Sequence, residues 1–290
     1  MMQIPTPSPP YVGVGDLAVN SCYYFPHFPS KNSMKRTVLI TGASSGIGAS
    51  LAKLFAERDF RLILNARNAS RLNEFRQSLG ENKDILTIPA DLSNDEGVEK
   101  LIREVEKKGH QVDVLVNNAA QMLWGDFPDH EKSSIEKLLQ LNICTLTTIT
   151  HHFLDGMISR GSGKILNVAS VAGFQPVPSM GLYAATKAFV ISFSESLAEQ
   201  VSTRGVSVTL LCPGVTDTPA AKPILQDLPP FFVSSSDDVA AEGFQALMAG
   251  EAICVPGLSN KAVLAWAKFQ PRSFIRKLGG VISRFGPTPH

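Results

Sequence analysis

Residues 37–48 read TVLITGASSGIG, an apolar run with β-branched side chains that passes directly into a glycine-rich segment. Leu51, Leu54 and Phe55 follow at the spacing of one face of a helix. A strand, a glycine turn and a helix in this order present free backbone N–H groups and a helix N-terminus to a phosphate group. The stretch therefore predicts the first strand and helix of an α/β domain that binds a phosphate-containing ligand.

The three glycines of this stretch have separate expected tasks. Gly42 permits a tight turn, Gly46 lets a pyrophosphate approach the backbone, and Gly48 lets the helix pack close to the strand. Their spacing is G-x-x-x-G-x-G, which differs from the common dinucleotide fingerprint G-x-G-x-x-G. A merely flexible turn is the alternative, which the flanking strand and helix disfavour. The other cofactor-binding candidates of this turn are Ser44, Ser45 and Ile47.

A second strand, predicted at residues 61–65, ends at Ala66 and Arg67. An NAD site usually carries an acidic residue near this point, which binds the ribose 2′-hydroxyl, whereas a 2′-phosphate needs a cation. Arg67 supplies a cation, and Ala66 stands where a carboxylate would repel the phosphate. We therefore expect NADP(H) rather than NAD. The alternative is that Arg67 is a solvated residue at the start of a helix.

Two further strands are predicted at residues 84–89 and 113–116, and polar residues follow both. The third strand leads to Asp91 and Leu92, where a polar side chain would hydrogen-bond an adenine ring. The fourth runs into amide and small residues, which line the crevice where ligands bind at the carboxyl ends of parallel strands. These residues are Asn117, Asn118 and Ala119.

Tyr183 and Lys187 lie four residues apart in the segment YAATK, so a helix would place the phenol and the ammonium group side by side. Tyrosine, with a pKa near ~10, is a poor proton donor or acceptor at neutral pH, but a nearby cation favours the phenolate and lowers this pKa. Tyr183 is therefore a candidate general acid/base. For the pair alone, a surface tyrosine and lysine one turn apart is the more common arrangement.

Two upstream residues argue against the interpretation of Tyr183 and Lys187 as an ordinary surface pair. Ser170 comes at the C-terminal end of a buried strand predicted at residues 164–168. Asn142 lies well inside a helix predicted from Ser133 to Met157, where asparagine is unfavourable. Asn142 therefore either faces solvent or has a specific hydrogen-bonding task. For Ser170 alone, a loop serine is the alternative.

In their order and spacing these motifs resemble those of the short-chain dehydrogenase/reductase family. The resemblance implies a single Rossmann-fold domain, which is a doubly wound α/β structure with a parallel sheet. Ala120 departs from the glycine that is usual after N-N-A, and its methyl group is tolerated if φ there is negative. The resemblance covers about residues 35–255 and rests on TGASSGIG at 41–48, NNAA at 117–120, Asn142, Ser170, YAATK at 183–187 and PGVTDT at 213–218.

The resemblance also implies a role for each of these residues. Ser170 would hydrogen-bond a substrate carbonyl, and Tyr183 would protonate its oxygen as hydride arrives from the nicotinamide. Lys187 would lower the Tyr183 pKa and bind the nicotinamide ribose, while Asn142 would hold a water that links Lys187 to solvent. Asn117 would lie along the cofactor. The other positions implied near the cofactor are Pro213, Gly214, Thr216 and Thr218.

The 290-residue chain is long enough for one large α/β domain, with 44% hydrophobic and 18% charged residues. Its net charge of +1 gives no reason to expect nucleic-acid binding. No apolar run approaches the ~20 residues of a membrane span. Because the cysteines lack metal-ligand spacing, we expect no metal site and a reducing, cytoplasmic setting. Cys22 is left undetermined, and the three expected to be buried are Cys144, Cys212 and Cys254.

The two ends of the chain differ from the domain expected over residues 34–258. Residues 1–33 are rich in proline and carry no Lys or Arg before Lys31, so they resemble neither a signal peptide nor a transit peptide. We expect a disordered tail, or an upstream start with Met34 as the first functional residue. Residues 259–290 predict a basic amphipathic extension, with apolar residues at helical spacing from Phe274 to Phe285. It would pack on the domain, meet a subunit or lie on a membrane surface.

Three loops are expected around the open end of the pocket, at residues 121–124, 174–180 and 219–233. They are poor in charge and rich in Met, Trp, Phe, Leu and Pro, which favours an apolar carbonyl compound. Phe231 and Phe232 either form part of a mobile lid or pack on the body of the domain.

The family resemblance implies an oxidoreductase that interconverts a carbonyl and an alcohol as a homodimer or homotetramer, and Arg67 favours NADP(H) as its cofactor. The segment VPGLSN at 255–260 resembles a bacterial-type subgroup whose substrates are mostly unassigned. One alternative is a non-catalytic NADP-binding sensor or regulator, which the intact set of catalytic residues disfavours. The other alternative is a membrane-surface reductase of lipid-like ketones or 3-oxoacyl substrates.

Overall fold

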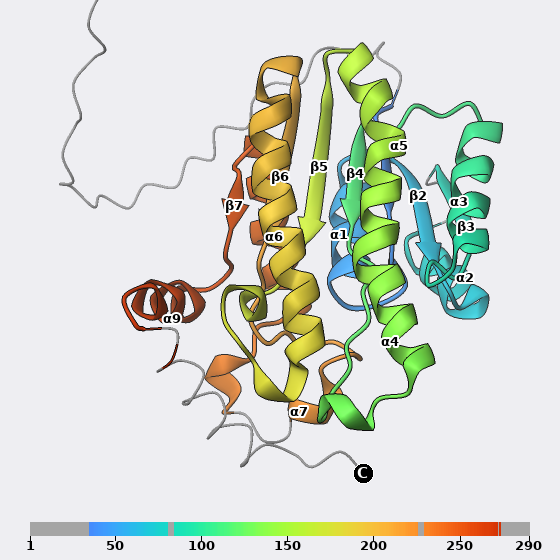
Figure 1. The fold of residues 1–290 in the computed structure, drawn as a ribbon. Helices are drawn as coiled ribbons and strands as arrows, with labels where there is room; N and C mark the ends of the chain where they lie inside the picture. Colours follow the sequence, from blue (N-terminus) through green and yellow to red (C-terminus); the bar gives the residue numbers. More distant parts are fainter. Residues whose placement is uncertain (1–34, 81–83, 226–228, 272, 274–290) are drawn as a thin grey trace, which may run out of the picture. The chain divides into compact units, whose positions relative to one another are not determined.

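The computed structural model describes residues 35–80, 84–225, 229–271 and 273 (Figure 1). The tail predicted at residues 1–33, Cys22 and the apolar repeat from Phe274 to Phe285 therefore lie outside the described residues. Within the described part of the chain, no helix is both long and apolar enough to cross a membrane.

The centre of the fold is a seven-stranded parallel sheet with the order β3-β2-β1-β4-β5-β6-β7 (Figure 1). The chain builds outward from β1 to β3 and then returns to place β4 on the other side of β1. This reversal creates a crevice at the carboxyl ends of the strands, where open α/β sheets bind ligands. The predicted doubly wound fold is confirmed. The strands are β1 (Thr37–Ile40), β2 (Arg61–Ala66), β3 (Ile85–Pro89), β4 (Val114–Asn117), β5 (Gly163–Val168), β6 (Val206–Leu211) and β7 (Ile253–Cys254).

Helices cover both faces of the sheet, because alternate residues of each buried strand point to opposite sides. In β1, for example, Val38 and Ile40 belong to the apolar cluster on one face and Leu39 to the cluster on the other. The helices on the first face are α1 (Gly46–Glu57), α2 (Ala69–Ser78) and α8 (Ser236–Ala249). Those on the second face are α3 (Asp95–Lys107), α5 (Leu146–Ser159) and α6 (Gly181–Val201).

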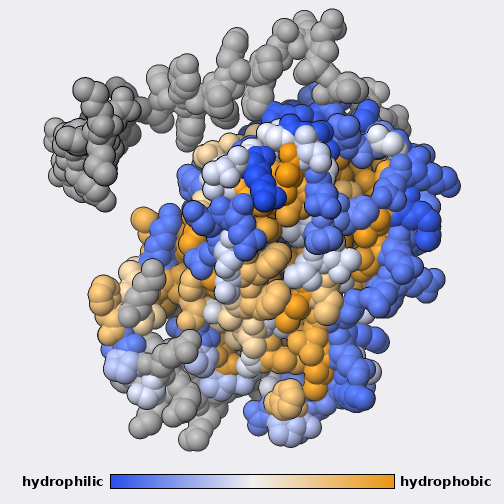
Figure 2. Space-filling model, turned by 45° about the horizontal axis from the view of Figure 1, so that its top comes forward, coloured by the Kyte–Doolittle hydropathy of each residue, from blue (hydrophilic) through white to orange (hydrophobic). Residues whose placement is uncertain are grey.

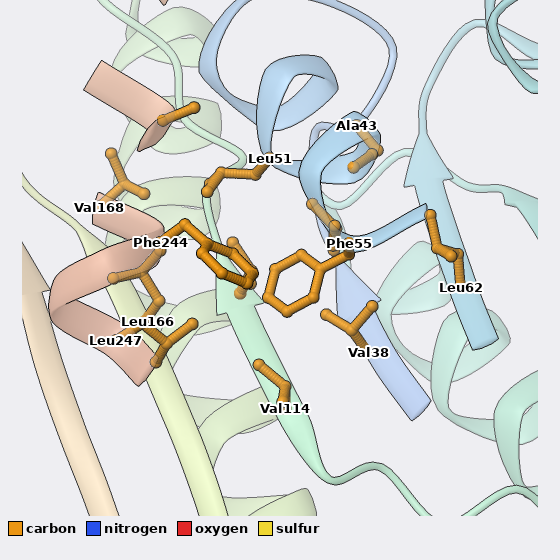
Figure 3. Close-up of a cluster of buried hydrophobic side chains, with 14 of the residues drawn as sticks. Val38, Ala43, Leu51, Phe55, Leu62, Val114, Leu166, Val168, Phe244 and Leu247 are labelled. Atoms are coloured by element: carbon orange, nitrogen blue, oxygen red, sulfur yellow. The ribbon is translucent and has the colours of Figure 1, made fainter. Parts of the chain in front are cut away.

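Aromatic packing fixes α1 against the sheet (Figure 3). The Phe55 ring meets the rings of Phe60 and Phe244 edge to face, at centroid distances of 5.0 and 4.9 Å. Phe55 is fully buried between α8 and the strands, beside Val38 and Val114. Because α1 begins directly after the glycine turn, this packing also holds the turn in place.

The helix predicted from Ser133 to Met157 is interrupted, so the expectation of one continuous α-helix was wrong. The structure has α4 (Lys132–Leu139), a π-helical segment η2 (Gln140–Thr145) and then α5. A π-helical turn holds one extra residue, and such turns are often found at functional sites. Asn142 lies in this segment and is 1% exposed, so it does not face solvent.

The N-cap of α8 is Ser235, whose Oγ accepts a hydrogen bond from the Asp238 backbone N–H at 3.0 Å. Asp237 and Asp238 lie in the first turn of α8, where negative charge interacts favourably with the helix dipole. The expectation that Cys144 is buried is wrong, because this residue is exposed on η2, whereas Cys212 and Cys254 are buried as expected.

Short elements complete the described chain after and between the strands. A helix follows β7 and is labelled α9 (Leu258–Lys268). The other short elements are η1 (Phe127–Asp129), η3 (Val171–Phe174), η4 (Pro178–Met180), η5 (Ser202–Arg204), α7 (Lys222–Leu225) and η6 (Pro230–Phe232).

Candidate active site

A cleft of about 720 Å³ lies at the carboxyl ends of the strands. Its walls come from the loops that follow the six strands β1 to β6, and this volume suits a small-molecule ligand. Of the predicted residues of the glycine turn, all but Gly48 line the cleft; these are Gly42, Ser44, Ser45, Gly46 and Ile47.

Gly48 contributes by leaving space beneath the turn. A Cβ atom at this position would collide with the Gly42 carbonyl oxygen and with Nδ2 of Asn118. Gly42 itself has a φ of 66°, a left-handed conformation that glycine adopts without strain. The two glycines therefore let the turn fold tightly between α1 and the end of β4.

Thr41, which sequence reasoning missed, ties this turn to the loop after β4. Its Oγ1 donates to the Val116 carbonyl at 3.2 Å and accepts from the backbone N–H groups of Asn118 and Ala119 at 3.0 and 3.1 Å. In return, Nδ2 of Asn118 donates to the carbonyls of Thr41 and Gly42 at 3.0 and 3.1 Å. Asn118 and Ala119 both line the cleft as expected.

Asn117 does not line the cleft, so its expected position along the cofactor is corrected. Its side chain is buried on the face covered by α5 and α6, because neighbouring strand residues point to opposite sides. Nδ2 of Asn117 donates to Oγ1 of Thr150 at 2.9 Å and to Oδ1 of Asn167 at 2.8 Å. Ala120 keeps a negative φ, since Asp59 is the one non-glycine residue with positive φ among those described.

Two arginines line the cleft beyond the end of β2. Arg67 is the predicted one; Arg71, one helical turn later, was missed, although its i, i+4 spacing from Arg67 is visible in the sequence. Asn68 lies between them and caps α2 by accepting a hydrogen bond from the Arg71 backbone N–H at 3.0 Å. This corner of the cleft therefore combines two cations with the N-terminus of a helix, an arrangement that favours an anion.

Asp91 and Leu92, after β3, also line the cleft. Oδ1 of Asp91 accepts from the backbone N–H of Ser93 at 3.0 Å and from its hydroxyl at 2.8 Å. The Leu92 carbonyl accepts from Oγ1 of Thr145, in the π-helical segment η2, at 2.7 Å. These bonds fix the wall of the cleft next to the arginine corner.

Tyr183 and Lys187 lie one turn apart on α6 and are 8% and 3% exposed. Nζ of Lys187 donates to the Val168 carbonyl at 2.8 Å and lies 5.6 Å from the centroid of the Tyr183 ring. Ser170, just beyond the end of β5, hydrogen-bonds the Tyr183 side chain. The structure thus gathers these three predicted residues at the floor of the cleft.

Burial controls the protonation of this group. It raises the pKa of Tyr183 to about 12, against the opposing effect of the Ser170 hydrogen bond, and lowers the pKa of Lys187 to about 8. The Tyr183 pKa therefore lies above its usual value, because the hydration that the phenolate loses on burial outweighs the hydrogen bond from Ser170. At neutral pH Tyr183 holds its proton and Lys187 remains mostly charged.

Asn142 has a specific hydrogen-bonding task. Its Oδ1 accepts from the Gln121 backbone N–H at 2.9 Å, and its Nδ2 donates to the Gln121 carbonyl at 2.9 Å. The same Nδ2 donates at 3.0 Å to Oγ1 of Thr186, which donates at 2.8 Å to the Tyr183 carbonyl. Asn142 and Thr186 therefore join the loop after β4 to the helix that carries Tyr183. Sequence reasoning missed Thr186, because its hydroxyl meets Asn142 only when the chain is folded.

The predicted residues after β6 also lie in the cleft wall. Thr216 bonds the Gly214 carbonyl through its hydroxyl at 3.1 Å. The Asn260 side chain, from α9, packs so closely on Gly214 that a Cβ atom there would overlap it. The four predicted residues found here are Pro213, Gly214, Thr216 and Thr218.

The end of the cleft beyond Ser170 and Tyr183 is uncharged and mostly apolar. Among the described residues that line the cleft, no charged side chain comes from the segments 121–124, 171–180 or 213–221. Phe231 and Phe232 do not line it. Their ring centroids lie 3.9 Å apart with the ring planes tilted by 35°, and the two residues are 71% and 43% exposed. The residues that shape this end are Met122, Trp124, Gln175, Val177 and Met180.

Comparison with known proteins agrees with this arrangement. Residues 36–229 match the sequence profile of the short chain dehydrogenase family. An uncharacterized oxidoreductase of Staphylococcus saprophyticus is 36% identical over 187 residues, which are 63% of this chain and 80% of that protein.

Two solved structures are similar to this chain in both fold and sequence. A short-chain dehydrogenase from Sphingobium yanoikuyae in complex with NADPH is 31% identical with a TM-score of 0.72, over 80% of this chain and 93% of that one. A bulky-bulky ketone specific alcohol dehydrogenase from Comamonas testosteroni is 28% identical with a TM-score of 0.70, over 82% of this chain and 96% of that one. The chain is therefore an oxidoreductase that belongs to the short-chain dehydrogenase family.

Proposed function

We propose that this oxidoreductase uses NADP(H) to interconvert an apolar ketone and the corresponding alcohol. The observation that carries the proposal is the placement of Ser170, Tyr183 and Lys187 at the floor of the cleft that also holds the glycine turn. A proton donor and a phosphate-binding turn in one cleft are what a nicotinamide-dependent reductase requires.

The residues present fit a nicotinamide dinucleotide. Gly42 and Gly48 add no side chains to the turn. Ser45, the N-cap of α1, makes no side-chain cap hydrogen bond, which leaves the first N–H groups of the helix for a phosphate. When bound, the cofactor supplies the hydride for reduction or accepts it for oxidation.

The chain's own residues supply the proton and the orientation. Ser170 donates a hydrogen bond from its hydroxyl to the substrate oxygen, and Tyr183 transfers its phenolic proton to that oxygen during reduction. Lys187, mostly charged at neutral pH, holds positive charge beside the phenol as negative charge develops on it. Asn142 holds the loop after β4 against α6 through its hydrogen bonds with Gln121 and Thr186.

Arg67 and Arg71 support the choice of NADP(H). Both residues line the cleft at the N-terminus of α2, and a guanidinium group is suited to a 2′-phosphate. We expect Arg67→Ala and Arg71→Ala each to weaken NADPH binding at least about 10-fold in a fluorescence titration and to leave NADH binding nearly unchanged. Arg76→Ala, in the last turn of α2, is the control. An unchanged NADPH preference in both variants would rule out this assignment.

The apolar end of the cleft supports an uncharged ketone flanked by large groups. The relative from Comamonas testosteroni is a bulky-bulky ketone specific alcohol dehydrogenase. In the present chain, Met122, Trp124 and Met180 line this end of the cleft and present apolar surface to such a ketone. The test is the oxidation of NADPH or NADH by the purified chain with a panel of aryl, alkyl and steroid ketones. Turnover confined to charged carbonyl compounds would contradict the proposed substrate class. Tight NADPH binding without turnover on any compound would favour a non-catalytic sensor.

A further inference from the structure

Two loops meet at the end of the cleft beyond Ser170 and Tyr183. One follows β4 and the other lies between β5 and α6, and these two strands are neighbours in the sheet. The Gly125 backbone N–H donates to the Ser179 carbonyl at 3.0 Å, which joins the two loops. This end of the cleft therefore has a wall that is built from both loops and held together by their backbones.

The polar side chains that this wall offers a ligand are those of Gln121 and Gln175. The other described residues of segments 121–124 and 171–180 that line the cleft are apolar, apart from the indole N–H of Trp124. Nε1 of Trp124 is buried and has no hydrogen-bond partner among the described residues, so it is closed to a ligand. Hydrogen bonding to a substrate at this wall therefore falls to the two glutamine amides.

Gln121 is held in a fixed position near the proposed proton donor. Its backbone N–H and C=O both bond the Asn142 side chain at 2.9 Å, and Asn142 also donates to Thr186 on α6. Because both backbone polar groups are occupied, the side-chain amide is the polar group that Gln121 has left for a ligand. A side chain whose backbone is fixed in advance binds its ligand at a smaller cost in entropy.

Gln175 lines the cleft from the other loop. It ends the turn η3, which begins directly after Ser170. In the part of the chain that the structure describes, the side chains of Gln175 and Gln121 make no hydrogen bond to another residue. A free amide carries both donors and an acceptor, so it suits a hydroxyl group or a carbonyl oxygen.

The wall is uncharged, although charged side chains are common elsewhere in the molecule. Near the amino-terminal ends of the strands, Lys35 pairs with Asp59 and Arg61 with Asp84, at 2.6 and 2.7 Å. Figure 2 turns that end of the sheet toward the reader, and hydrophilic residues gather along its upper edge. The cleft opens at the other end, where the wall combines apolar surface with two uncharged amides.

We propose that Gln121 and Gln175 select a ketone that carries an uncharged hydrogen-bonding oxygen, either a hydroxyl group or a second carbonyl, away from the reacting carbonyl. This inference rests on the proposed ketone reduction and narrows its substrate class. A wholly apolar ketone would cover the two amides without giving them a partner, and an unpaired buried amide disfavours binding. A carboxylate fits less well, because the described residues of the wall supply no cation.

The test compares ketones that share a carbon skeleton and differ by one hydroxyl group. Suitable pairs are cyclohexyl phenyl ketone with its hydroxycyclohexyl counterpart, and a steroid ketone with and without a hydroxyl group on its distal ring. Affinity for the complex with NADP⁺, in which the ketone cannot be reduced, is titrated by intrinsic fluorescence, and kcat/KM is measured with NADPH. We expect the wild type to favour the hydroxylated member of a pair at least about 10-fold in both measurements.

Gln121→Met and Gln175→Met remove the amide and keep the length of the side chain. Each should reduce the preference at least about 3-fold, and the double variant should abolish it. Affinity for the hydroxyl-free ketone should be kept or should rise, which a structural defect would not produce. Circular dichroism checks that the variants fold. Gln200→Met, at an exposed position of α6, is the matched control.

Each outcome decides the proposal. A preference that the double variant loses and the Gln200 variant keeps supports it. Equal affinity of the wild type for both members of every pair, or binding of none of them, overturns it, as does a preference that the double variant keeps. A single variant that keeps the full preference overturns the assignment of that residue. A preference in binding without turnover of any ketone would instead contradict the proposed reduction and leave the selection of hydroxylated ketones standing.

Discussion

At the scale of single residues, burying the lysine of the proposed catalytic group lowers the stability of the fold. Lys187 is 3% exposed, and burial lowers its pKa from 10.5 to about 8. Below about pH 8 this lysine is protonated in both the folded and the unfolded chain, so the full cost of burying its charge is present. As the pH rises from about 8 towards 10.5, the folded chain binds fewer protons than the unfolded chain, and the cost is progressively relieved.

We therefore expect Lys187→Met to raise the free energy of unfolding by roughly 1–3 kcal/mol at pH 7, with the gain shrinking towards pH 10. Urea unfolding at both pH values measures the difference. Lys53→Met, at an exposed position on α1, should show no such pH dependence. A Lys187→Met protein that is less stable than wild type at pH 7 would show that the buried charge is fully compensated.

Sequence reasoning found the residues whose chemistry is recognisable in a motif, such as Tyr183 and Ser170. It placed Asn117 along the cofactor, whereas Asn118 lines the cleft. Neighbouring residues at the end of a strand point to opposite sides of the sheet, and the sequence does not show which of the two amides faces the cleft. It missed Thr41 and Thr186, since a hydroxyl that bonds distant backbone groups has no local signal. It also did not anticipate that burial raises the Tyr183 pKa, because the burial of this side chain is revealed only by the fold.

At the scale of elements, the π-helical segment η2 connects the cleft wall to α6, the helix that carries Tyr183. Asn142 in this segment bonds Gln121 on one side and Thr186 on the other. The sequence predicted a continuous helix here, because apolar spacing alone does not distinguish an α-helical turn from one with an extra residue. The asparagine in mid-helix was the one sign of a special task.

Removing the Thr186 hydroxyl should loosen this connection. We expect Thr186→Val to lower the free energy of unfolding by about 1–2 kcal/mol and kcat by about 10-fold, because Nδ2 of Asn142 loses an acceptor. Thr186→Ser keeps the hydroxyl and should recover most of both. The measurements are urea unfolding and steady-state kinetics. Equal behaviour of the valine and serine variants would mean that the hydroxyl does not matter.

The glycine turn gives a second test at this scale. In Gly48→Ala the new methyl group would meet the Gly42 carbonyl and the Asn118 amide, neither of which is free to move. We expect NADPH binding to weaken at least about 10-fold and stability to fall by about 1–3 kcal/mol. Gly156→Ala is the control, because its Cβ would meet only the end of the Arg160 side chain. Normal NADPH affinity in Gly48→Ala would contradict the role given to this turn.

At the scale of the whole molecule, a parallel sheet brings loops far apart in the sequence to one edge. The cleft is lined from Gly42 to Ala221, and its chemistry appears only when the six strands lie side by side. The order of glycine turn, amides, Ser170 and the YAATK helix was enough to predict this fold. The exposed apolar residues of α9 were not predictable, because residues 258–269 contain apolar positions whose outward direction is set by packing against Gly214 and η3.

The most direct test of the proposed function compares wild type and Tyr183→Phe in NADPH oxidation, with a ketone that the wild type reduces and with NADPH affinity titrated in parallel. Removing the phenolic proton should lower kcat/KM at least about 100-fold, because general acid catalysis contributes roughly that much, while NADPH affinity stays the same. If Tyr183→Phe keeps near-normal turnover, this tyrosine is not the proton donor and the account of the cleft is wrong.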